Sequence, residues 1–342
     1  MDRRDEIREF LISRRAKITP EQAGIPTYRN LRRVPGLRRE EVAHLAGVST
    51  DYYTRLERGS IRGVSDTVLE AVSSALQLDD AERAHLMDLA RTAAAPPPRT
   101  PRRPAQQRVR PGVLRLLDGM TGVVALVQNG RSDVLAANLL GRALYGPMFN
   151  SAAQFSSAEQ FNSAAQLSPA GQSGPRTHDR LPNQARYLFL DPGAGDFYPD
   201  WRAVAATTVA MLRLESGRNP TDRALNELVG ELTTRSALFA GLWAGHDVRI
   251  HTAGTKRFHH PVAGDLSLQF ETLDLPGDEG QTLFTFTAEP GSASGNALAF
   301  LASWAASPPE TTTAGGPAGG TTTPGMRSPA QPGTHIQGKT EP

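Results

Sequence analysis

The chain of 342 residues is long enough for two hydrophobic cores, and its net charge is only +2. It contains no cysteine, which excludes disulfides, thiol nucleophiles and thiolate-bound zinc and fits a reducing cytoplasm. No stretch approaches the roughly 20 apolar residues of a membrane span, and the N-terminal residues lack the apolar core of a signal peptide. We therefore expect a cytoplasmic protein with no membrane partner.

The charge is distributed unevenly along the chain. Residues 1–110 hold 21 Lys and Arg against 15 Asp and Glu, a net charge of +6, and the remaining residues hold 16 against 20, a net charge of −4. A basic segment is the electrostatic mark of nucleic-acid binding. The first third of the chain is therefore where we look for a DNA-binding element.

The first expected helix covers residues 4–16, where Ile7 and Phe10 belong to an apolar stripe. Thr19 and Pro20 resemble the N-cap and the first position of another helix. These elements precede the motif that carries most of the functional information.

Residues 38–59 have the pattern of two short helices around a tight turn. Val42 and Ala46 recur at helical spacing, and Gly47 can adopt the positive φ of a turn. Ser49 is a suitable N-cap for the second helix. In a helix-turn-helix the second helix lies in the DNA major groove and presents its N-terminal side chains to base edges. The outward-facing side chains that we predict to contact bases are Thr50, Asp51, Thr54 and Arg55.

An αα-hairpin that only packs would also accept small residues and a turn glycine. The preceding sequence favours DNA binding instead, because five arginines fall within eleven residues that contain no acid. A cluster of one sign beside a helix start suits phosphate oxygens. The arginines of this cluster are Arg29, Arg32, Arg33, Arg38 and Arg39.

Two further helices are expected before residue 91. Ser65 or Asp66 can cap one of them, and Asp79 and Asp80 start the other. Five helices of this length make a compact all-α domain, which we assign to residues 1–91.

This domain resembles a known family in its motif residues. The segments 33–43 and 52–59 look like regulators of the phage-repressor (Xre-like) superfamily, and specifically like the MmyB-like family. The resemblance implies a five-helix, lambda-repressor-like DNA-binding fold that binds double-stranded DNA. It places the four predicted side chains of the second helix at the base edges, and it puts Arg39 and Arg58 near phosphates.

Residues 92–110 contain five prolines, which favour an extended spacer, so we expect the domain boundary here. The arginines of this segment could touch DNA, but a solvated linker is the simpler interpretation. Two other segments have a composition that argues against a packed core. Residues 146–183 are interpreted as a low-complexity insertion that forms a mobile loop, and residues 307–342 as a disordered tail.

The second domain, residues 111–306, begins with a predicted hairpin. Two short apolar runs, 123–127 and 132–136, flank Asn129 and Gly130, which is a strong hairpin signal. The remaining expected helices are 139–144, 186–190, 201–214, 221–234, 236–244 and 297–305, and the remaining expected strands are 247–252, 264–275 and 281–288.

Two strands, a run of helices and three strands is the order of a PAS-like domain, so the whole chain is an α+β multidomain protein with a five-stranded antiparallel sheet in its second domain. Segments such as 133–138 and 254–261 also resemble the C-terminal part of the MmyB-like family. The resemblance runs from about residue 4 to 306, apart from the insertion. One departure is Ala137, where the family usually has an aromatic residue, and this substitution would enlarge the cavity.

A PAS-like sheet with helices over one face encloses a pocket that is mainly apolar with a few polar anchors. The resemblance implies a small hydrophobic, fatty-acyl-like effector. Lys256 and Arg257 could pair a carboxylate, although charges in a loop are usually solvated. A buried Trp can equally be plain core, and Asn138 can simply cap the helix that follows it. The candidate ligand contacts are Asn138, Trp201, Trp243 and Phe270.

Catalytic and metal-binding patterns are weak in this sequence. His246, His251, His259 and His260 crowd one segment, but adjacent histidines on a strand point to opposite faces and no HExxH spacing occurs. Nucleophile elbows, phosphate loops and dinucleotide motifs are also absent from the sequence. We expect no cofactor, no metal site, no catalytic residues and no enzymatic activity.

The sequence thus predicts a DNA-binding transcription regulator, acting as a homodimer, whose PAS-like domain senses a small hydrophobic effector. The alternative is a protein-interaction adaptor with weak, non-specific DNA binding, for which the acidic second part would suit a basic partner.

Overall fold

The computed structural model describes most of the chain. The described residues are 3–26, 34–94, 107–151, 181–248, 252–278 and 280–307. Several sequence predictions therefore lie outside them: Arg29, Arg32 and Arg33, most of the linker, most of the insertion, His251 and nearly all of the tail.

The first domain is all-α, as predicted. The apolar stripes of its helices pack together to form the core of the domain, and Ile7, Phe10 and Leu11 of the first helix are fully buried there. The helices are α1 (Arg3–Lys17), α2 (Arg39–Leu45), α3 (Thr50–Glu57), α4 (Asp66–Ala75) and α5 (Asp80–Ala94).

The segment that follows α1 is a turn, and the prediction of a further helix at Thr19 and Pro20 was wrong. The Thr19 backbone N–H donates to the Gln22 side chain (2.9 Å), and the Gln22 N–H donates to the Thr19 hydroxyl (3.3 Å). The chain then reverses at Gly24, which has a positive φ of 71°. The reciprocal hydrogen bonds between Thr19 and Gln22, which resemble those at a helix start, therefore stabilise a single turn that no helix follows.

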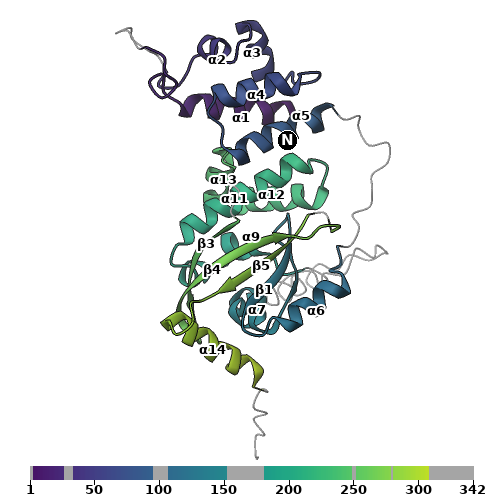
Figure 1. Cartoon of the computed structure of the whole chain (residues 1–342), viewed down its shortest axis with the longest axis vertical. Helices are drawn as coiled ribbons and strands as arrows, with labels where there is room; N and C mark the ends of the chain where they lie inside the picture. Colours follow the sequence, from purple (N-terminus) through teal and green to yellow (C-terminus); the bar gives the residue numbers. More distant parts are fainter. Residues whose placement is uncertain are drawn as a thin grey trace, which may run out of the picture. The chain divides into compact units, whose positions relative to one another are not determined.

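The second domain contains a five-stranded antiparallel sheet with the strand order β2-β1-β5-β4-β3. The first two strands form the predicted hairpin, and β5 returns to pair with β1, as neighbouring arrows in Figure 1 show. This order is the PAS-like topology expected from the sequence. The strands are β1 (Val124–Asn129), β2 (Val134–Ala137), β3 (Ala253–His260), β4 (Gly264–Asp274) and β5 (Gln281–Thr287).

Helices cover both faces of the sheet. Helix α6 packs Val113 and Leu117 against Ala125 and Val127 on one face. The alternate residues of the same strands, such as Phe286, pack with helices on the other face. The helices of this domain are α6 (Pro111–Gly119), α7 (Leu139–Leu144), α9 (Gln184–Leu190), α10 (Ala194–Phe197), α11 (Trp201–Arg218), α12 (Arg223–Arg235), α13 (Ala237–Ala244) and α14 (Ala293–Ala306).

Two element predictions need correction. The strand expected at 247–252 begins instead at Ala253, and its alternation places Lys256, Phe258 and His260 on one face. Basic residues in this run hid the alternation. Residues 146–151, which were predicted to belong to a mobile loop, are helical, and Met148 is buried in the core of the sheet domain.

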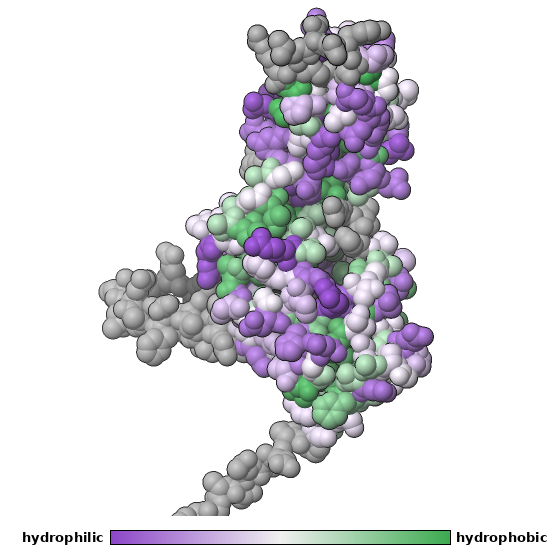
Figure 2. Space-filling model, turned by 90° about the vertical axis from the view of Figure 1, so that its left-hand side faces the viewer, coloured by the Kyte–Doolittle hydropathy of each residue, from purple (hydrophilic) through white to green (hydrophobic). Residues whose placement is uncertain are grey.

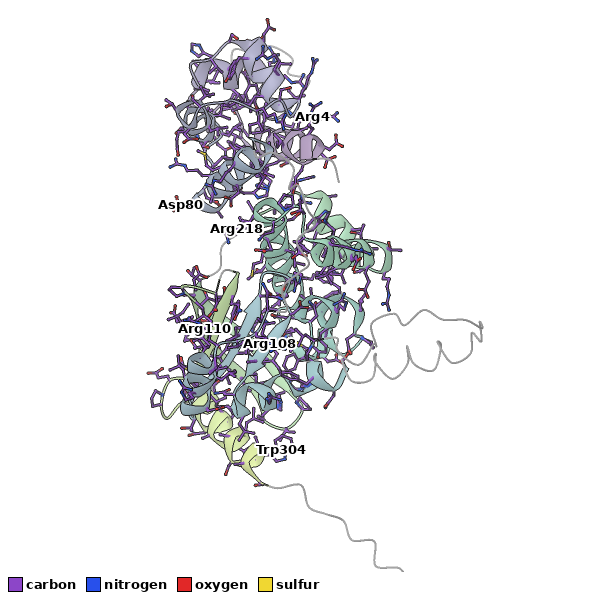
Figure 3. The ribbon with its side chains drawn as sticks, turned by 90° about the vertical axis from the view of Figure 1, so that its right-hand side faces the viewer. Arg4, Asp80, Arg108, Arg110, Arg218 and Trp304 are labelled. Carbon is purple, nitrogen blue, oxygen red and sulfur yellow. The ribbon has the colours of Figure 1, made fainter. Side chains whose placement is uncertain are left out.

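The last residues of the linker belong to the second domain. Gln107 accepts a hydrogen bond from Asn129 (2.8 Å), and Arg110 forms an ion pair with Asp278 (2.5 Å) between β4 and β5. Figure 3 labels Arg110 beside this sheet. The described end of the segment predicted to be a solvated linker is therefore anchored by polar contacts.

DNA-binding surface and ligand cavity

The turn between α2 and α3 has the geometry that the sequence predicted. Gly47 has a positive φ of 65°, which a residue with a Cβ rarely adopts. Ser49 caps α3 by accepting a hydrogen bond from the Tyr52 backbone N–H (3.1 Å). Helix α3 then buries Tyr53 and Leu56 in the domain core. The opposite face of this helix is consequently left to the solvent.

The four side chains predicted to contact bases are on that outer face. Thr50, Asp51 and Arg55 are exposed and Thr54 is half-buried, and their spacing places them on one side of α3. The Arg55 guanidinium lies 5.8 Å from the centre of the Tyr52 ring. Hydrophilic side chains predominate over the helices of this domain in Figure 2. The outer face of α3 therefore presents hydrogen-bonding groups of the kinds that read base edges.

The described arginines that we predict to contact DNA phosphates have different neighbours within the protein. All three, Arg38, Arg39 and Arg58, are exposed, and the Nε of Arg39 also donates to the Glu57 carboxylate (2.8 Å). Glu57 is only 1% exposed and also accepts a hydrogen bond from Arg15 of α1 (2.8 Å). The sequence analysis missed this ion network, which ties α1, α2 and α3 together. Arg39 thus has a structural partner in addition to its predicted phosphate contact.

A cavity of about 230 Å³ lies between α11 and the sheet of the second domain. Its walls are mainly apolar, with Val204 and Met211 on α11 and three phenylalanines on the strands, and polar groups include Thr208. An adjacent, more polar cavity of about 480 Å³ shares wall residues with the first. The shared residues are Gln128, Ser132, Met211 and Phe284. A mainly apolar cavity with a few polar groups is the usual form of a small-molecule site.

The four residues predicted to contact the ligand do not lie at one site in the structure. Phe270 lines the cavity, but the other three residues line neither cavity. Asn138 caps α7, accepting from the backbone N–H groups of Ala125 and Gly141, and its amide donates to two carbonyls. The hydrogen bonds of this side chain hold the backbone around it, and its predicted contact with the ligand stays a prediction.

The two tryptophans also have structural roles. Trp201 donates its indole N–H to the Leu188 carbonyl (3.0 Å) and packs against the sheet core. Trp243 stacks on Phe239, and the Arg213 guanidinium lies 4.1 Å from its ring centre. Both rings are core elements, and the sequence carries no signal that separates such rings from ligand contacts.

Lys256 and Arg257 lie on β3 and not in a loop, and both line the cavity. Arg257 forms a bidentate pair with Asp200, with one N···O distance of 2.6 Å. This pair lowers the pKa of Asp200 and raises the pKa of Arg257. Among the described residues, Lys256 has no acidic partner, and burial lowers its pKa to about 8.

Helix α11 also contacts helix α5 of the DNA-binding domain. Gly217 lies so close to α5 that an added Cβ would be 2.6 Å from the His85 imidazole. The next residue of α11, Arg218, labelled in Figure 3, pairs with Asp88 of α5 (3.4 Å). The same helix thus forms the cavity wall and meets the DNA-binding domain.

The His85 imidazole is fully buried, and burial, followed by the charge of Arg213, lowers its pKa to about 3. The unfolded chain binds this proton from about pH 6.5 downward, so His85 makes the folded chain less stable as the pH falls from 6.5 towards 3. We expect His85→Leu to reduce the slope of unfolding free energy against pH by about 1.4 kcal/mol per unit between pH 6 and 4. Urea unfolding at several pH values measures this slope, with His44→Leu, an exposed position on α2, as the control. An unchanged slope in His85→Leu contradicts the burial of a neutral imidazole.

The histidines of the crowded segment are separated in the structure. His246 contacts Glu9, His259 contacts Asp265, and His260 contacts the Ala143 carbonyl. Among the described residues, no group of three His, Cys, Asp or Glu side chains is arranged to hold a metal ion. The same part of the chain contains no helix with the length and apolar character needed to cross a membrane.

Comparisons with known proteins agree with this geometry. Residues 28–86 match a helix-turn-helix domain, and residues 109–301 match the MmyB-like transcription regulator ligand binding domain. The first match falls on α2–α5 and the second on the sheet domain that holds the cavity. Together they define a DNA-binding transcription regulator with a ligand-binding domain. The second match covers more than half of the chain, and the protein belongs to the MmyB-like transcription regulators. No curated protein matches the chain.

Proposed function

We propose that this protein reads an operator through α3 and changes its operator affinity when a small hydrophobic, fatty-acyl-like effector binds in the sheet domain. The observation that carries the proposal is the position of α11. Its residues from Ala203 to Met211 form one wall of the cavity, while Gly217 and Arg218 contact α5. An effector that binds more tightly when α11 is in one position would act on the DNA-binding helices through the contact between α11 and α5. A difference in affinity for two conformations is what drives a conformational switch.

The same proposal assigns the residues that contact DNA. Thr50, Asp51, Thr54 and Arg55 contact bases, while Arg38, Arg39 and Arg58, with Arg32 and Arg33, contact phosphates. A homodimer would place two copies of α3 about 34 Å apart, one helical turn of DNA. Sedimentation of the protein bound to its operator tests the dimer, and a one-to-one complex on a complete operator contradicts it.

Two variants separate base reading from phosphate binding. Thr54→Ala is expected to relax the preference at one base position, at a cost of about 1–3 kcal/mol on the preferred sequence. Arg58→Ala is expected to weaken binding to all DNA sequences alike. It should also lower the slope of log K against log salt concentration by about 1. Binding titrations on preferred and scrambled duplexes at several salt concentrations measure both effects.

Arg223→Ala is the matched control, because Arg223 is an exposed arginine of α12 that pairs only with Glu227 in the described contacts. It should leave DNA affinity unchanged. If Thr54→Ala and Arg58→Ala affected preferred and scrambled DNA equally, the assignment of α3 to base reading would be contradicted.

The effector proposal is tested by native mass spectrometry of the purified full-length chain. We expect a hydrophobic small molecule to co-purify with the protein and to be lost when the cavity is filled by Thr208→Phe. The alternative function, an adaptor with weak DNA binding, predicts no preferred operator under any condition. We propose a regulator and not an enzyme, because both matched family models describe domains of DNA-binding transcription regulators.

A further inference from the structure

The side chain of Lys256 enters the apolar cavity from the inward face of β3. The Nζ atom lies 5.2 Å from the ring centre of Tyr198 and 6.0 Å from those of Phe258 and Phe286. Its backbone neighbour across the ladder is Leu268. An ammonium group is thus held among aromatic rings at a position that the sheet pattern gives to apolar residues.

No acid neutralises this ammonium group among the described residues. Asp200 is the acid in the cavity wall, and Arg257 already binds both of its carboxylate oxygens. Within the described part of the chain, the Nζ atom lies over three aromatic rings instead. Cation–π contacts offset part of the cost of removing a charge from water, but they leave the charge without a counterion.

A buried charge is normally paired, and a pairing group that the chain does not supply can come from a ligand. The remainder of the cavity wall sets the chemistry of that ligand. The wall of the cavity that holds Lys256 includes an apolar surface formed by Phe270, Phe284 and Met211. Two polar residues, Gln128 and Ser132, line both this cavity and the adjacent polar one. A ligand that satisfies both features has one anionic end and an apolar body.

We propose that Lys256 determines the head-group specificity of the effector site by binding the anionic head of an amphiphile whose apolar body lies against Phe270, Phe284 and Met211. This inference rests on the proposed sensing of a hydrophobic effector and adds the charge and the residue that recognises it. Carboxylate and sulfate heads share the required charge and acceptor oxygens, so both are tested.

Isothermal titration of the full-length chain at pH 7 compares decanoate, decyl sulfate and decanol, which share a ten-carbon chain. The wild type should bind at least one anion ten or more times more tightly than decanol. Lys256→Met keeps an unbranched side chain, one heavy atom shorter, and removes the charge, so it should bind the anions no better than decanol while its decanol affinity stays within about twofold. Because the substitution removes an unpaired charge from an apolar site, we expect the variant to fold and to unfold at an equal or higher urea concentration.

The double variant Glu227→Gln with Arg223→Met is the matched control. It removes an exposed ion pair of α12, outside the cavity, without changing the net charge, and it should keep the preference for anions. A second readout is proton uptake. At pH 8.5 the anion should restore the proton that burial removes from Lys256, so binding enthalpies measured in buffers of different ionisation enthalpy should show uptake in the wild type and none in Lys256→Met. The other ionisable groups that face Lys256, Asp200, Arg257 and Tyr198, are common to both proteins.

The outcomes separate this inference from the proposed function. If the wild type binds both anions and decanol equally, or if Lys256→Met keeps the preference for anions, the role of Lys256 is wrong while hydrophobic sensing stands. If the wild type binds none of the three probes, hydrophobic sensing itself is contradicted, and the inference fails with it.

Discussion

Replacing Glu57 by Gln is expected to lower the free energy of unfolding of the DNA-binding domain by about 3 kcal/mol. The carboxylate is 1% exposed and accepts hydrogen bonds from Arg15 and Arg39, both at 2.8 Å. A neutral amide would leave two guanidinium groups without their counter-charge, and removing one partner of a buried ion pair costs far more than the pair contributes. Since this network joins α1, α2 and α3, the recognition helix would lose its fixed position, and DNA affinity should fall with stability.

Urea unfolding followed by circular dichroism measures the first effect, and titration on the preferred duplex measures the second. Glu70→Gln is the matched control, because Glu70 is half-exposed and pairs with Arg83 at 3.4 Å on the surface. Exposed pairs of this kind contribute about 0–1 kcal/mol. Equal stability of the two variants would show that Glu57 does not hold the helices together.

Replacing Gly217 by Ala is expected to disturb the contact between α11 and α5. The new Cβ would lie 2.6 Å from two atoms of the His85 ring, which is fully buried and cannot move into solvent. Overpacking of this kind costs about 1–3 kcal/mol. We therefore expect lower stability and a smaller change in operator affinity on adding decanoate, because α11 would no longer be seated on α5.

Gly230→Ala is the control for the loss of glycine in a helix. Gly230 lies on α12, and a Cβ there would meet no atom within 4 Å. Alanine is favoured over glycine in a helix by about 1 kcal/mol, so this variant should be slightly stabilised and should respond to decanoate as the wild type does. If both variants gained stability, the close approach of α11 to His85 would be contradicted.

Local signals were sufficient to predict the DNA-binding element. Gly47 and Ser49 determine the turn and the start of α3 by their own conformation and hydrogen bonding. The Asn129-Gly130 hairpin was found in the same way, and the order of strands and helices along the chain indicated the five-stranded antiparallel sheet. Each of these features depends on residues that are close together in the chain.

The ligand site depended on contacts between distant residues, and the sequence could not supply them. Arg257 and Asp200 are 57 positions apart, so nothing in the sequence distinguished a paired Arg257 from an unpaired Lys256. Asn138, Trp201 and Trp243 are polar or aromatic like many ligand contacts, and the sequence could not supply their hydrogen-bond and stacking partners within the chain. Glu57 was missed for the same reason, since Arg15 is 42 positions away.

The central claim is that α3 reads sequence and that the cavity controls this reading. The most direct test is selection of duplexes by the intact protein from a randomised DNA pool, with and without decanoate. We predict enrichment of one short motif with two-fold symmetry and a change in its enrichment when decanoate is present. A pool that remains random at every salt concentration, with and without the amphiphile, would contradict the account and would favour an adaptor.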